Sequence, residues 1–69
     1  MKLVIVYEVQ ETEGLIAQKS RFINFSELFG YYRTIEDAIK KELREGEKFV
    51  YACIENQDDE RIYLESLKI

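Results

Sequence analysis

Residues 31–46 have the sequence YYRTIEDAIKKELREG, which carries the start, the apolar face and the end expected of a single helix. Thr34 is a favoured N-cap, and Asp37 follows three residues later in a weaker form of the capping box. Gly46 is placed to supply the left-handed residue that ends a helix. Apolar residues recur at spacings of three and four on one side: Ile35, Ala38, Ile39 and Leu43. We therefore predict one helix that packs this face against strands.

The segments on either side of this helix are typical of strands. Residues 2–10 are rich in β-branched side chains and residues 49–54 are almost wholly apolar, and in both the apolar positions fall on both faces. This pattern favours central strands. Residues 11–14 predict a turn into an antiparallel partner at residues 15–25. Residues 56–59 predict a polar turn, and residues 61–69 a closing edge strand.

The segment before the helix is open to two interpretations. Residues 26–30 fit either a helical turn capped by Ser26 or a loop that leads to a short strand at residues 29–33. We favour a short edge strand or an extended lead-in at Tyr31 and Tyr32. The predicted fold is α+β: a four- or five-stranded, mostly antiparallel sheet with one helix packed on one face. The order is two strands, an optional short strand, the helix and two further strands.

The length and the charge of the chain favour a small single-domain protein and argue against some kinds of partner. We expect residues 1–69 to form a single domain. Fourteen acidic residues outnumber ten basic ones, for a net charge of −4, which argues against binding to nucleic acid or to anionic membranes. A lone cysteine, Cys53, forms no internal disulfide and fits a reducing cytoplasm. The apolar run at residues 3–7 is too short for a membrane span and lacks a signal cleavage site, so we expect a cytoplasmic chain.

Several kinds of chemistry lack their usual residues. The chain has no histidine, the commonest general base and metal ligand, and a single cysteine cannot build a structural zinc site. Its three glycines are far apart and form no phosphate-binding loop. Cys53 lies among apolar residues, so we interpret it as inert core rather than as a nucleophile. We expect no enzyme, no cofactor and no metal.

The candidate partner-binding residues fall in two groups. The first is an aromatic segment with more rings than one helix can shield: Phe25, Phe29, Tyr31 and Tyr32. Exposed rings of this kind are frequent anchors at protein interfaces. The second group is Asp58 and Asp59 at the predicted acidic turn. This turn is either an ordinary solvated loop or a patch that docks on a basic surface.

Residues 29–40, FGYYRTIEDAIK, carry a family resemblance. The run resembles a pattern in small uncharacterised phage and mobile-element proteins, in which a strand ending in Gly-Tyr-Tyr leads into a capped helix. The resemblance implies a phage or mobile-element origin, where short acidic proteins often bind a host protein. It carries over no site residues.

These observations lead to three functional hypotheses. The first is a non-enzymatic protein-binding module, encoded by a phage and acting as an inhibitor or modulator of a host protein. The second is a homo-oligomeric structural or accessory subunit, such as a homodimer, that buries the aromatic segment between copies. A minimal enzyme or small-molecule binder built from tyrosines and carboxylates ranks last.

Overall fold

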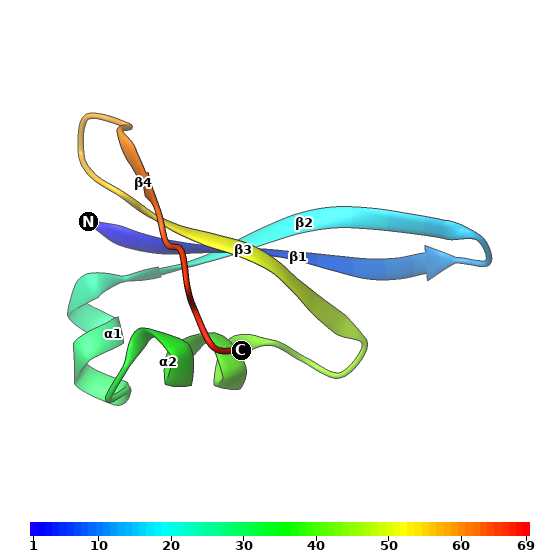
Figure 1. Ribbon diagram of the computed structural model, residues 1–69, viewed down its shortest axis with the longest axis horizontal. Coiled ribbons are helices and arrows are strands. Elements are labelled where there is room, and N and C mark those ends of the chain that lie inside the picture. Colours follow the sequence, from blue (N-terminus) through cyan, green and yellow to red (C-terminus); the bar gives the residue numbers. More distant parts are fainter.

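A four-stranded antiparallel sheet and two short helices make up the chain (Figure 1), in a computed structural model that describes residues 1–69. The strands lie in the order β2-β1-β3-β4. The elements in chain order are β1 (Lys2–Thr12), β2 (Leu15–Asn24), α1 (Phe25–Tyr31), α2 (Ile35–Glu42), β3 (Glu47–Glu55) and β4 (Arg61–Tyr63). The predicted α+β class, with a four-stranded antiparallel sheet, is confirmed.

The two strands with apolar residues on both faces are central, as predicted. β1 pairs with β2 on one side and with β3 on the other, so that Leu3 lies between Ile23 and Ile54. The register between β1 and β3 shifts between Val6 and Tyr7, which increases the local twist. β4 lies at the edge beside β3, but it is only three residues long.

The core lies between one face of the sheet and the helices. It consists of seven buried residues: Leu3, Ile5, Ile23, Leu28, Ala38, Ile39 and Ala52. Figure 1 shows both helices on the same side of the sheet, with the C-terminal segment running from β4 toward α2. Leu64 and Leu67 of that segment pack against the core. The opposite face of the sheet has no helix over it.

Helix α2 begins as predicted but ends early. The Thr34 hydroxyl accepts a hydrogen bond from the Asp37 N–H at 3.0 Å, which confirms the N-cap. The helix ends at Glu42, because the Glu42 carbonyl accepts a bond from the Arg21 guanidinium at 2.6 Å instead of one from a further helical turn. Gly46 has a φ of +85°, yet it serves the turn into β3 and not the end of the helix.

The short strand favoured near Tyr31 and Tyr32 is wrong, because residues 25–31 form helix α1. Helical spacing allows Leu28 to enter the core, with Phe25 and Tyr32 packed beside it. The capping position falls on Asn24, not on Ser26, and the Asn24 side chain makes no capping bond. Tyr32 is extended, so the lead-in to α2 is shorter than we expected.

The predicted closing strand at residues 61–69 is also too long. Pairing with β3 stops at Tyr63, and the chain then leaves the sheet. Leu64 and Leu67 turn toward the core, and Ser66 between them adopts a φ of +60°. Burying two leucines beneath the sheet thus outweighs the extension of an edge strand.

Ala38 tests which face of α2 is buried. Its side chain is fully buried in the core, so Ala38→Arg should unfold the domain by placing an unpaired charge there. We expect circular dichroism to show no cooperative melt for this variant. Lys40→Arg, at an exposed position of the same helix, is the control and should melt as the parent does. An unchanged melt for Ala38→Arg would contradict the core described here.

Candidate functional site

Helix α1 divides the predicted aromatic segment into supporting and exposed rings. Phe25 packs against the core, and its ring meets the Phe29 ring edge-on, with centroids 5.4 Å apart. Phe29 is 64% exposed and Tyr31 is 79% exposed. Tyr32 packs against the core, and its hydroxyl donates to Glu42 Oε1 at 2.6 Å. Phe29 and Tyr31 are therefore the two exposed rings of α1, hereafter the aromatic ridge, and Phe25 packs beneath the Phe29 ring.

The acidic candidates, Asp58 and Asp59, lie in the turn between β3 and β4. The Asn56 side chain organises this turn by accepting bonds from the N–H groups of Asp58 at 2.9 Å and Glu60 at 3.0 Å. Both aspartates are exposed. In Figure 1 this turn and α1 lie on opposite sides of the start of β1, so the two predicted groups do not form one continuous site.

The densest polar cluster surrounds Arg21 on the helix-bearing side of the sheet. Its guanidinium binds both carboxylate oxygens of Glu47 at 2.9 Å, donates to the Tyr7 hydroxyl at 3.3 Å and lies over the Tyr7 ring. The Arg44 N–H also donates to Glu47, at 2.7 Å. The bonds from Arg21, followed by the bond from Arg44, lower the pKa of Glu47 to about 2. Because the cluster satisfies its own charges, it joins β2, β3 and the end of α2 as a structural clamp.

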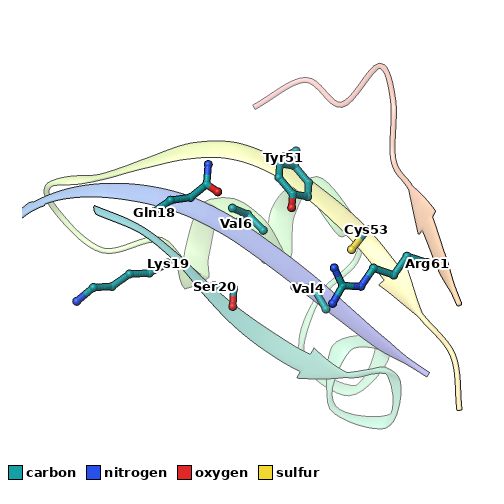
Figure 2. A pocket seen from close by; sticks show the side chains of 8 residues that line it. All are labelled: Val4, Val6, Gln18, Lys19, Ser20, Tyr51, Cys53 and Arg61. Carbon is teal, nitrogen blue, oxygen red and sulfur yellow. The ribbon is translucent and has the colours of Figure 1, made fainter. Parts of the chain in front are cut away.

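The uncovered face of the sheet is the feature that the sequence analysis missed. A depression of about 300 Å³ lies on it (Figure 2), and its lining residues are Val4, Val6, Gln18, Lys19, Ser20, Tyr51, Cys53 and Arg61. In Figure 2 the Tyr51 ring stands beside Val6, the Arg61 side chain extends toward Val4, and the Lys19 side chain points away. The sequence signal was present: β1 and β3 are apolar on both faces, and two short helices cover only one.

Cys53 is buried within this uncovered face. It is 1% exposed, and burial raises the pKa of its thiol. The Arg61 guanidinium opposes that shift. The predicted burial of Cys53 is confirmed, and a thiol with a raised pKa is a weaker nucleophile near neutral pH.

Two further properties bear on function. No three His, Cys, Asp or Glu side chains come together as candidate metal ligands. Neither helix is long and apolar enough to cross a membrane.

Comparison with known proteins adds no relative. No protein-family model matches the chain, and searches of curated proteins and of solved structures found no match. The surfaces described above are therefore the basis for a functional assignment.

Glu47 predicts how stability depends on pH. Its pKa is lower in the folded chain than its ordinary value of 4.5, so its contribution is full above pH 4.5 and is lost as the pH falls toward 2. The melting temperature of Glu47→Gln should lie below that of the parent at pH 7, and the difference should shrink across this window. Glu45→Gln, at an exposed neighbour, is the control. A difference that stays constant down to pH 2 would contradict the clamp.

Cys53 predicts slow thiol chemistry in the native state. A thiol reagent should label it at least about tenfold more slowly in buffer than in denaturant, because access requires opening of a central strand. The rate is measured by absorbance with an aromatic disulfide reagent. Ser20→Cys in a Cys53→Ser background supplies an exposed thiol on the same face as the control. Equal native and denatured rates at Cys53 would show that β3 opens freely.

Proposed function

We propose that this chain is a small non-enzymatic protein-binding module, encoded by a phage or mobile element, that inhibits or modulates a host protein. The observation that supports the proposal is the aromatic ridge on α1. Phe29 and Tyr31 expose most of their surface on a helix whose inner residue, Leu28, is 1% exposed. Rings this exposed bury little area in the core, and aromatic side chains are enriched at interface hot spots.

The ridge is held rigidly, which favours binding. No loop separates β2 from α1, because Asn24 ends the strand and Phe25 begins the helix. The Phe25 N–H donates to the Met1 carbonyl at 3.1 Å and fixes the helix to the start of β1. The edge-on contact with Phe25 orients the Phe29 ring. A preorganised surface loses less conformational entropy on binding than a mobile one.

The chemistry of the partner follows from the ridge and the charge. Two exposed rings on one helix require apolar contacts on the partner, and the net charge of −4 favours a basic rim around them. Glu27 in the first turn of α1 adds acidic character beside the rings. The same acidic balance supports a protein as the occupant, instead of nucleic acid or an anionic membrane. The free buried thiol of Cys53 fits a reducing compartment, so we place the interaction in the host cytoplasm.

Asp58 and Asp59 enter the proposal as a second, separate contact. Because they lie away from α1, a partner would have to extend around the end of the sheet to meet both groups. Their effect is expected on the rate of association more than on affinity, as for exposed charges at a rim. A homo-oligomeric accessory subunit is the second candidate function, and the uncovered face of the sheet favours it.

The double variant Phe29→Ser/Tyr31→Ser tests the ridge. Loss of two hot-spot rings should weaken binding to the host partner by about 100-fold or more. The tagged parent is first used to capture and identify the partner, and affinities are then measured by calorimetry with the purified pair. The control is Leu15→Ser/Ile16→Ser, which removes two equally exposed apolar side chains at the far hairpin.

The outcome depends on both affinity and fold. We expect unchanged circular dichroism for both double variants and weak binding only for the ridge variant. If the ridge variant loses its fold, the rings are core and not an interface. If it folds and binds as the parent does, the captured partner uses another surface.

A further inference from the structure

The side of the sheet opposite the helices, hereafter the open face, has an apolar centre. Cross-strand register places one row of side chains across all four strands: Phe22, Val4, Cys53 and Tyr63. Val6 and Tyr51 lie in the next row, and the rings of Tyr51 and Tyr63 are 5.7 Å apart. Phe22 and Tyr63 are each 57% exposed at the two edges of the row. The open face thus has buried small side chains in the middle and exposed rings on both sides.

The acidic and basic side chains of the open face nearly balance in number. At one end Glu55 binds Lys2 at 3.6 Å and Arg61 at 3.0 Å. At the other end Glu8 lies opposite Lys48 in the register of β1 and β3. A single-stranded nucleic acid needs free cations for its phosphates, and Lys2 and Arg61 are already engaged by Glu55. The open face is therefore close to neutral in a chain whose net charge is −4.

A nearly neutral apolar face on an acidic chain is suited to an identical face. Two chains of like charge repel each other, and contact through their least charged surfaces minimises that repulsion. The ends of the open face differ, since Lys2 and Arg61 share the single Glu55 at one end, whereas Glu8 and Lys48 balance each other at the other. A two-fold axis that runs across the strands places the basic end of one copy over the balanced end of the other and so keeps the two basic ends apart. Charge thus favours a second copy in a defined orientation.

The size of the open face sets the strength of this contact. Residues 2–8 of β1 span about 20 Å, three neighbouring strands span about 14 Å, and the three residues of β4 add a short fourth strand. Each copy therefore offers roughly 330 Å² in projection, and the pair would bury on the order of 800 Å² of accessible surface. That area lies at the lower end for specific interfaces, so we expect a weak dimer that forms at micromolar concentrations or above.

We propose that the open face binds a second copy of this chain, so that two sheets pack face to face with the helices outside. Aligned sheets pack about 10 Å apart at about 30°, with side chains of the two faces interdigitating. The exposed Phe22 and Tyr63 rings fit this arrangement, because a two-fold axis across the strands sets each edge of one sheet over the same edge of the other, where these rings cover the sides of the contact. This inference is independent of the ridge on α1, which lies on the other side of the sheet.

Sedimentation equilibrium of the full chain tests the dimer. Over about 10 µM to 1 mM, the mass should rise from one chain of 8.3 kDa toward twice that value. Phe22→Glu should weaken association at least about tenfold, since it buries a charge in an apolar contact. Phe29→Glu is the matched control, because Phe29 is similarly exposed but lies on α1. Tyr63→Glu, at the opposite edge of the row, repeats the test if Phe22→Glu fails to fold.

Four results would overturn the proposal, three of them from measurements of self-association. The first is a monomer at every concentration, and the second is a dimer that Phe29→Glu dissociates and Phe22→Glu does not. The third is protection from hydrogen exchange, on dimerisation, of the β2 backbone N–H groups that point away from β1. Such protection would show that the two sheets pair through their β2 edges and not through their open faces. A fluorescent oligothymidine is the probe for the alternative occupant. If the oligothymidine binds the monomeric chain and Phe22→Glu abolishes that binding, the open face is assigned to single-stranded nucleic acid. This result would also overturn the proposal.

Discussion

The amount of helix in this chain limits how much of the sheet can be covered. Two helices of seven and eight residues are enough to bury the side of the sheet that holds Leu3, Ile5 and Ala52. The central strands nevertheless carry apolar side chains on both sides, at Val4 and Val6 as well as at Leu3 and Ile5. A small domain buries a smaller fraction of its surface than a large one, and here the hydrophobic core lies in the one layer between the sheet and the helices. The open face follows directly from this limit.

The end of the core is set by a polar interaction. Beyond α2 the β1–β2 hairpin extends past the helices (Figure 1), and Leu15 and Ile16 near its tip are exposed. The Arg21 cluster lies where helix cover stops, and it links Glu47, Tyr7 and the Glu42 carbonyl. A bidentate arginine–carboxylate pair is one of the stronger polar contacts available to a partly buried site. It holds the strands together at the point where apolar packing no longer can.

Local signals in the sequence predicted the elements whose determinants are local. The Thr34 cap, the spacing of Ala38 and Ile39, and the two-sided β1 and β3 all appear in the structure. The end of α2 was not predictable, because it depends on Arg21, which is 21 residues away from Glu42 in the chain. Helix α1 was missed because residues 25–31 are few, contain Gly30 and fit an extended pattern as well as a helical one.

The candidate site was predictable only to the level of a segment. The sequence showed more aromatic rings between residues 22 and 32 than one helix can cover. Which of these rings are exposed depends on the side of α1 that faces the sheet. In a helix, Leu28 and Tyr32 lie on one side with Phe25, and this leaves Phe29 and Tyr31 outside. Phe22 belongs to the open face instead, since it precedes the helix and alternates with Ile23 on β2. One apparent cluster is therefore two surfaces.

These two surfaces lie on opposite sides of the sheet, which has a consequence for binding. A dimer formed through the open faces would place both copies of α1 on the outside, each with its own Phe29 and Tyr31. Such a dimer would be bivalent, and bivalent contact with an oligomeric host protein can raise avidity by 10²–10⁴ without any new contact. Because the open face is small, the dimer would form only as the chain accumulates. Under the proposed function, binding to such a partner would then rise more steeply than in proportion to concentration, since weak self-association and ridge binding would reinforce each other.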